Sequence, residues 1–389
     1  MLHESSGGLG TVKQDSAADS GGRKKSVGSD AAPLRLWNYL AWSVIIFCAL
    51  LRFTPLQAQP YFYHGKSYGS EAQYSPLIVL LNGGYDILQL DKYEQRIFRY
   101  PLGRNAATVL RNLGRPLPLI NDYGWGRFLR TEVLPLNFSK GASWWPNYQL
   151  HLVGGGMTYR RLQEWFTHHG APLPQLWSAM TVMGYHLLNE MVENNSEEGE
   201  LIDPIADIYL FDIGGILLFS SDAVARFFSE ELQLTDWSTQ PTLMLTDASL
   251  RNTGQNFVLR YALPFWEDYS LLYVFGLNGM GGLSRRFANG HSVSVAMGLR
   301  ARDIYQQEDH PLALSASLTW NAALYWDREN SLLASLQFSG ISSNVATLNV
   351  YPGVIGSMPW SPGLWCTLTT EGRVMGGITV RWLPGLGLR

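Results

Sequence analysis

The chain has 389 residues, of which 46% are hydrophobic and only 16% are charged, and its formal net charge is -3. Soluble domains carry about 25% charged residues, whereas a helical membrane protein would have a mean hydropathy well above the -0.05 found here. The composition therefore disfavours both of these classes, and the slight negative charge argues against nucleic acid as a partner.

A transmembrane β-barrel fits between these two classes, because its strands alternate side chains that face lipid with side chains that face the lumen. The 39 glycines and the 13% of aromatic residues point to the same class. We therefore expect an α+β membrane protein built on an antiparallel transmembrane β-barrel.

The first 58 residues are expected to be a disordered leader and a signal peptide. Residues 1–33 are polar, and the apolar run 36–51 with the small-residue exit near Ala58 is typical of a secretory signal. A single membrane anchor is the alternative, but the run is short and ends at Arg52. After cleavage Cys366 is the one remaining cysteine, so no internal disulfide is expected, and its place in a strand pattern predicts burial.

Residues 59–145 have a mixed pattern, which indicates a periplasmic region or the first strands. Residues 74–81 are typical of a short strand, and residues 104–112 have a weak helical period that ends at Gly114. Arginines alternate with aromatic residues here; they are Arg96, Arg99, Arg104, Arg111, Arg115, Arg127 and Arg130. We interpret them as a solvated face, with contact to phosphates of lipopolysaccharide or anionic lipid as the alternative.

Residues 146–235 form a predicted helical module. Helices are expected at 148–168, at 174–193 and from Asp203 onward, with a shorter amphipathic helix at 221–232. Asp203 is expected to cap the third helix ahead of Pro204. Asp207 and Asp212 have no capping role, and for Asp212 a water-facing position stays open as the alternative. The glycines of two runs are expected to let helices approach closely; they are Gly154, Gly155, Gly156, Gly214 and Gly215.

Four ionisable residues of this module are the candidate site: His151, His186, Glu190 and Asp207. They stand among apolar residues on three helices, where ionisable groups need partners, a metal or a function. No complete catalytic or zinc signature surrounds them. We favour a hydrogen-bonded network that fixes the helix register. A divalent metal site, an acid/base pair and a proton- or ligand-linked switch stay open, and so does the identity of any metal or cofactor.

Residues 236–389 change to a period of two. In residues 291–300 valine, methionine and leucine alternate with serine, alanine and glycine, and residues 311–326 repeat this alternation over a length that suits a tilted membrane strand. We expect roughly 8–12 antiparallel strands that close into a barrel, with the helical module in or beneath the lumen. A soluble β-sandwich is the alternative.

The helical module resembles an uncharacterised family of bacterial outer-membrane proteins. The resemblance lies in His151-x-x-Gly-Gly-Gly, Asn189-Glu190-x-x-Glu193, Asp203-Pro204-x-x-Asp207 and Gly214-Gly215. It covers about residues 145–220, and the chain departs from the family before the histidine and in the run 203–207, where the family has a Pro-Ser-x-Asn-Asp type of sequence. The family implies an outer-membrane location and a C-terminal barrel, with no activity attached.

We therefore expect an integral outer-membrane barrel with a structural or accessory role in envelope assembly or lipid handling. Its expected partners are outer-membrane lipid or lipopolysaccharide and other envelope proteins. The alternative is a membrane-embedded hydrolase of lipid or lipopolysaccharide that uses His151, His186, Glu190 and Asp207, with or without a metal. A passive channel is disfavoured, because so bulky an insert would block a small lumen.

Overall fold

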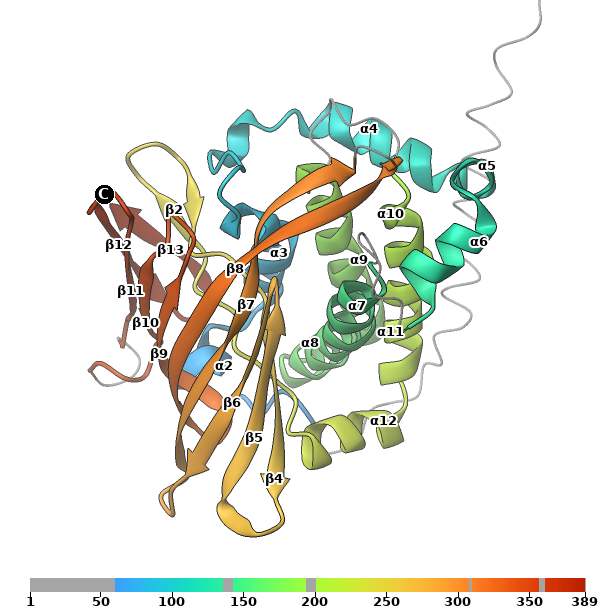
Figure 1. Ribbon diagram of the computed structural model, residues 1–389. Coiled ribbons are helices and arrows are strands. Elements are labelled where there is room, and N and C mark those ends of the chain that lie inside the picture. The colour runs from blue at the N-terminus through green and yellow to red at the C-terminus, as the bar shows by residue number, and fades with distance from the viewer. Residues whose placement is uncertain (1–59, 136–142, 194–200, 308–309, 357–360, 389) are drawn as a thin grey trace, which may run out of the picture. The chain divides into compact units, whose positions relative to one another are not determined.

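Helices occupy the first part of the described chain and strands the second part (Figure 1). The computed structural model describes residues 60–135, 143–193, 201–307, 310–356 and 361–388, all within a unit that spans residues 50–389. The expected leader and signal peptide, residues 1–58, lie outside the described residues.

Short helices, rather than strands, make up the region before residue 136. They are α2 (Gly69–Gln73), α3 (Pro76–Gly84), η1 (Asp86–Gln89), η2 (Ile97–Arg99), α4 (Leu102–Leu113), α5 (Pro116–Tyr123), α6 (Trp125–Phe128) and η3 (Leu129–Val133). The strand predicted at residues 74–81 is wrong. Ser75 caps a helix there by accepting a hydrogen bond from the Ile78 N–H, and Pro76 occupies its first turn. These helix-start signals outweigh the strand signal of the apolar run. The helix predicted at 104–112 is confirmed as part of α4.

Two buried carboxylates hold the first described residues against this core. Glu164 accepts hydrogen bonds from the backbone N–H groups of Tyr61, Phe62 and Tyr63, at 2.7–3.0 Å. Glu71 accepts from the N–H of His64 and of Lys66. The segment of residues 61–66 is therefore fixed by charge-assisted hydrogen bonds.

The helical module is confirmed as a run of helices, several of which contain π-helical segments. Its elements are α7 (Trp144–Pro146), η4 (Asn147–Gly155), α8 (Gly156–His168), α9 (Pro174–Glu193), α10 (Asp203–Ala206), η5 (Asp207–Asp212), α11 (Ile213–Phe219), α12 (Asp222–Arg226) and η6 (Phe227–Glu231). The segments η4, η5 and η6 are π-helical. Among the described residues no single helix is long and apolar enough to cross a membrane. One pair of consecutive helical segments, Asp203–Phe219 with Asp222–Glu231, has the length and composition of a membrane span. The two segments are bent by 85° relative to each other.

All described strands belong to a single sheet. They are β1 (Thr235–Asp236), β2 (Thr242–Met244), β3 (Leu250–Arg251), β4 (Asn256–Leu263), β5 (Trp266–Gly276), β6 (Asn278–Arg286), β7 (His291–Gln307), β8 (His310–Arg328), β9 (Ser331–Ser339), β10 (Ala346–Val350), β11 (Gly363–Leu368), β12 (Val374–Val380) and β13 (Leu383–Leu388). From β4 to β13 each strand pairs antiparallel with the next, and β2 joins β13 in parallel.

The predicted closed barrel of 8–12 strands is corrected to an open, curled sheet of 13 strands. Its edge strands are β1, next to β4, and β3, next to β2. The chain passes from one end of the strand order to the other between Asp236 and Thr242, a span of at most about 20 Å. The two ends therefore approach each other, but no strand pairing joins β1 to β3 among the described residues.

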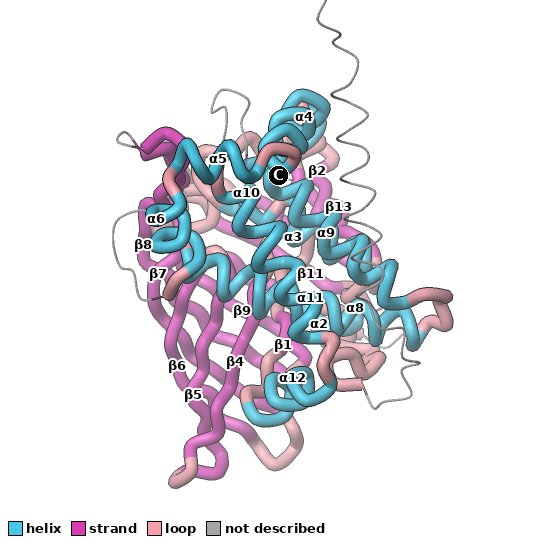
Figure 2. Tube along the Cα trace, turned by 90° about the vertical axis from the view of Figure 1, so that its right-hand side faces the viewer, coloured by secondary structure: helices cyan, strands magenta, loops and turns pink. Residues whose placement is uncertain are grey.

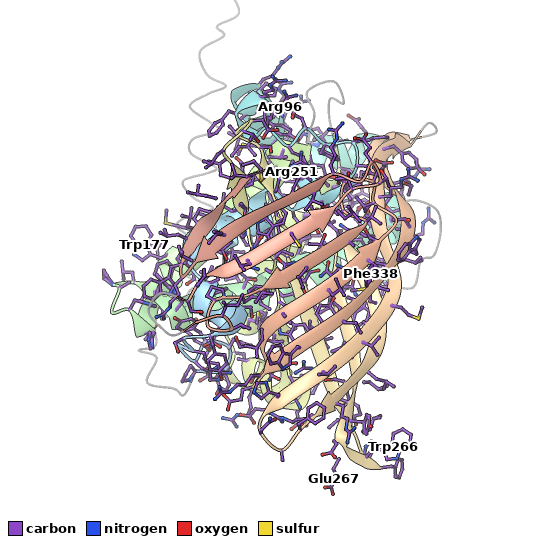
Figure 3. The ribbon with its side chains drawn as sticks, turned by 90° about the vertical axis from the view of Figure 1, so that its left-hand side faces the viewer. Arg96, Trp177, Arg251, Trp266, Glu267 and Phe338 are labelled. Carbon is purple, nitrogen blue, oxygen red and sulfur yellow. The ribbon has the colours of Figure 1, made fainter. Side chains whose placement is uncertain are left out.

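The two faces of the sheet have opposite character. Helices cover one face, as Figures 1 and 2 show, and the other face carries no helix (Figure 3). Along β7 the outward side chains Val293, Val295 and Met297 are large and exposed, whereas the alternate residues Ser294 and Ala296 are buried. The same alternation continues on β8, where Leu318, Trp320, Leu324 and Trp326 are exposed. Along β7 the covered face thus carries small or polar side chains, whereas the open face of β7 and β8 carries large apolar ones.

The predicted burial of Cys366 is wrong. Its thiol is free and exposed on β11, while its neighbours Trp365 and Thr367 are buried. The period of two explains the difference, because Cys366 falls on the open face of the sheet.

Candidate functional site

The candidate site is a histidine–carboxylate cluster at the meeting point of three helical elements. His151 comes from η4, His186 and Glu190 from α9, and Asp207 from η5. The imidazole centroids of His151 and His186 are 4.5 Å apart. His151 Nε2 lies 3.5 Å from Asp207 Oδ2. The histidines and Asp207 therefore do converge, as the sequence analysis considered possible.

Asp212, for which the sequence analysis left a water-facing position open, is the centre of the cluster. Its side chain is fully buried, and its Oδ1 lies 2.9 Å from His151 Nδ1 and 2.6 Å from His186 Nδ1. The water-facing alternative for Asp212 is therefore wrong.

The π-helical backbone explains why Asp212 was missed. In an α-helix of 3.6 residues per turn, Asp207 and Asp212 would point about 140° apart. They lie at the two ends of η5, where hydrogen bonds run from i to i+5 and a turn is wider, so both carboxylates face His151. His151 itself lies on η4, a second π-helical segment. A fixed period of 3.6 therefore assigns the wrong face to a residue of this cluster.

Glycines set the spacing around the histidines. An added Cβ at Gly155 would lie 3.0 Å from His186 Cε1, so only a hydrogen at that position lets the imidazole reach Asp212. An added Cβ at Gly156 would lie 2.4 Å from the Phe219 ring, and one at Gly154 would lie 2.6 Å from the Phe257 ring on β4. The predicted role in close helix approach is confirmed for Gly155 and Gly156, whereas Gly154 faces a strand.

The protonation states follow from the neighbours of each group. Burial opposes the charged form of His151, but Asp207 and Asp212 raise its pKa to about 9. Burial lowers the pKa of His186 below its usual value, against the attraction of Asp212. For Asp212 burial acts upward, yet the two histidines bring its pKa below the usual value. At neutral pH the core is therefore a His151 cation, a neutral His186 and an Asp212 carboxylate.

Two further carboxyls of the cluster, those of Glu190 and Asp207, have raised pKa values. Burial raises the pKa of Glu190 well above its usual value, and the neighbouring Glu193, Asp203 and Asp212 add to the shift. Burial also raises the pKa of Asp207 well above its usual value, although His151 acts in the opposite direction. Burial therefore disfavours the ionised form of both carboxyls, while the neighbouring His151 favours the ionised form of Asp207.

Asp203 does not cap its helix, contrary to the sequence-based expectation. The helix begins at Asp203 itself, and no side chain caps it. The Asp203 carboxyl is buried against Glu132 of η3 and forms a hydrogen bond with it. Burial raises the pKa of Asp203 to about 6, and burial together with Asp203 raises the pKa of Glu132 well above its usual value. The two carboxyls therefore share a proton.

Replacing Glu132 by glutamine is expected to weaken the dependence of stability on pH. In the folded protein this pair keeps protons that the unfolded chain releases above about pH 4. The contribution of this pair to the free energy of unfolding is therefore lost as pH rises through the Asp203 pKa of about 6. The side-chain amide introduced by E132Q donates a hydrogen bond to Asp203 as the protonated Glu132 does, but it does not ionise. Relative to wild type, the free energy of unfolding of E132Q should rise by about 2 kcal/mol between pH 4 and pH 7.

Denaturant unfolding at several pH values measures this difference. Asp122 is exposed on α5, so D122N serves as the matched control and should show a difference from wild type that does not change with pH. A constant difference for E132Q over the same range would contradict the shared proton.

The basic interval of the N-terminal region is largely at the surface. Arg99, Arg104, Arg111, Arg115 and Arg130 are exposed, and Arg96 forms an ion pair with Glu94. This arrangement agrees with a solvated face.

Comparison with known proteins adds no relative to this geometry. No family model, curated protein or solved structure matches the chain.

Proposed function

We propose that this chain is an integral outer-membrane protein whose open sheet face contacts lipid, with a structural or accessory role in envelope assembly or lipid handling. The observation that supports the proposal best is the apolar open face of the sheet. In this proposal the strands enter the membrane, and the helices fill the covered side of the sheet.

The open face is too apolar for water. Monomeric soluble proteins rarely expose contiguous apolar patches larger than a few hundred Å². Here exposed large apolar side chains continue across neighbouring strands from β5 to β9, and they include Leu271, Leu283, Val295, Met297, Leu299, Leu318, Leu324 and Phe338. Phe338 lies within this face in Figure 3. A lipid phase would cover these side chains at no cost.

Strand length and aromatic placement support the same proposal. A tilted strand needs about 9–11 residues to cross a bilayer. The strands β5 to β9 have 11, 9, 17, 19 and 9 residues. Trp266 lies at the tip of the β4–β5 hairpin, beside the charged Glu267 (Figure 3). Such a pairing of tryptophan and charge is typical of a membrane–water interface.

The packing of the helices favours an accessory role over an open channel. The ring of Phe257 on β4 packs against Gly154, and Gln149 donates a hydrogen bond to Tyr273 on β5. Farther along the sheet, the Ser75 hydroxyl on the α3 side donates to the carbonyl of Trp382. Helices therefore occupy the space beside several strands.

A lipid or lipopolysaccharide hydrolase is the second candidate. It is favoured by one observation, the convergence of His151 with Asp207 and Asp212. Two cavities of the described residues hold about 20 and 40 Å³ and are lined by other residues, which is room for one or two water molecules. The accessory role therefore comes first.

Replacing Met297 by arginine tests the membrane proposal. Met297 is 72% exposed on β7, so in water an arginine there should change the free energy of unfolding by less than about 0.5 kcal/mol. In a bilayer the same change should cost about 2–4 kcal/mol, because the charge leaves water for hydrocarbon. The measurement is reversible unfolding from phospholipid vesicles, together with the yield of heat-modifiable protein in outer-membrane fractions.

Ala288 offers a matched control in the same hairpin. It is exposed in the turn between β6 and β7, where an added arginine stays in water. A288R should therefore behave like wild type in vesicles and in fractions. If M297R were as stable in vesicles as A288R, the lipid-facing assignment of the open face would fail.

A further inference from the structure

We propose that His151, His186 and Asp212 bind a divalent transition-metal ion of the zinc type, and that Asp207 orients His151 for this role. The inference concerns the helical module alone and does not depend on where the sheet resides. It replaces the register-fixing network, which the sequence analysis favoured, with a ligand site.

The three side chains have the positions that a metal site requires. One ligand atom from each lies within 4.8 Å of the others. In a tetrahedral zinc site with bonds of about 2.0–2.2 Å, ligand atoms are separated by about 3.3 Å. The Asp212 oxygen lies 2.9 Å from His151 Nδ1 and 2.6 Å from His186 Nδ1. Outward shifts of the ligand atoms by less than about 1 Å would therefore bring their separations to this value and make room for the ion.

Buried polar atoms without a hydrogen-bond partner supply an independent observation. Asp212 Oδ2 and His186 Nδ1 are both inaccessible to water and lack a partner, and their residues are only 1% and 5% exposed. The 2.6 Å approach of His186 to Asp212 is thus close without being directed as a hydrogen bond. Leaving such atoms unsatisfied costs about 1–3 kcal/mol each, and a shared cation would satisfy both.

The surroundings of His151 also suit a metal ligand. A histidine that ligates a metal through one ring nitrogen donates its other N–H to a carboxylate in many metal sites. Asp207 Oδ2 lies 3.5 Å from His151 Nε2, on the side opposite Asp212. His151 keeps a side-chain exposure of 13%. Glu190 lies one helical turn beyond His186 on α9.

The donor set indicates the class of ion. Two imidazole nitrogens and one carboxylate oxygen suit zinc and similar first-row ions, whereas Mg²⁺ and Ca²⁺ prefer oxygen ligands throughout. Binding of the ion displaces a proton from His151, because the ion and the proton compete for the same nitrogen.

Calorimetric titration with ZnCl₂ tests the proposal on the full chain. The protein carries a tag without histidine, is stripped with a chelator and is titrated in detergent. Wild type should bind one zinc per chain. D212N and H186Q should bind at least about 100-fold more weakly because each loses a ligand, and D207N about 10–100-fold more weakly because it loses the orienting carboxylate. Circular dichroism of each variant reports whether it has folded.

His169 is exposed at the end of α8 and stacks on Trp165, away from the cluster, so H169Q is the matched control and should bind like wild type. If the ligand variants fail to fold, X-ray absorption of zinc-loaded wild type decides, since it should show two imidazole ligands. The proposal is overturned if wild type binds no zinc, if D212N keeps wild-type affinity, if H169Q loses affinity equally, or if imidazole scattering is absent.

Discussion

Replacing Gly215 by valine is expected to lower the free energy of unfolding by about 3 kcal/mol or more. A Cβ at Gly215 would lie 2.6 Å from the carbonyl oxygen of Leu152 and 2.9 Å from that of His151. Both obstacles are backbone atoms, so no side chain can move aside and α11 must separate from η4. The measurement is denaturant unfolding followed by tryptophan fluorescence.

Gly103 is the matched control for this substitution. It is exposed in α4, and an added Cβ there meets nothing within 4 Å. Since alanine favours a helix over glycine by about 1 kcal/mol, G103A should be slightly more stable than wild type. A G215V variant within 0.5 kcal/mol of wild type would show that the helix crossing is not close-packed.

The same variant connects packing with the cluster. Gly215 touches the carbonyl of His151, so a wider crossing would move the His151 ring away from Asp212. G215V should therefore also weaken zinc binding. The glycines of this crossing thus place the ligands, although none of them has a side chain.

Replacing Glu164 by alanine is expected to lower the free energy of unfolding by about 3–5 kcal/mol. Its carboxylate accepts hydrogen bonds from the backbone of residues 61–63 and from Arg160. The variant leaves the Arg160 guanidinium, which is 1% exposed, with only Asp222 as an anionic partner. It also releases the N–H groups that fix the first described residues. Denaturant unfolding gives the stability, and limited proteolysis near residue 61 reports the release.

An exposed glutamate provides the comparison. Glu230 lies on η6 and is exposed, so E230A should change the free energy of unfolding by less than about 0.5 kcal/mol and leave the cleavage pattern unchanged. If E164A unfolded like E230A, the buried carboxylate would not anchor this segment.

Local signals predicted much of the helical module. The helix at 174–193 and the helix within 102–113 were predictable because caps, prolines and hydrophobic period act over a few residues. The period of two also identified the outward residues of β7 and β8. The same kind of reading failed at residues 74–81, where the serine cap and the proline were overlooked in an apolar run.

The candidate site was only partly predictable. The unusual setting of His151 and His186 among apolar residues was visible in the sequence, and the structure brings both rings together. Asp212 was missed because its side-chain direction depends on the π-helical turns of η5. Glu132 was missed because its partner Asp203 lies 71 positions away in the chain.

The sequence by itself determined where helices give way to strands and which strand residues alternate. These properties depend on local sequence patterns, namely caps, prolines and the spacing of apolar residues. Only the tertiary structure decided that the sheet stays open, that Asp212 sits between two histidines and that Cys366 faces outward. The first two depend on contacts between distant segments, and the third on which face of the sheet the helices cover. No period along the chain specifies these.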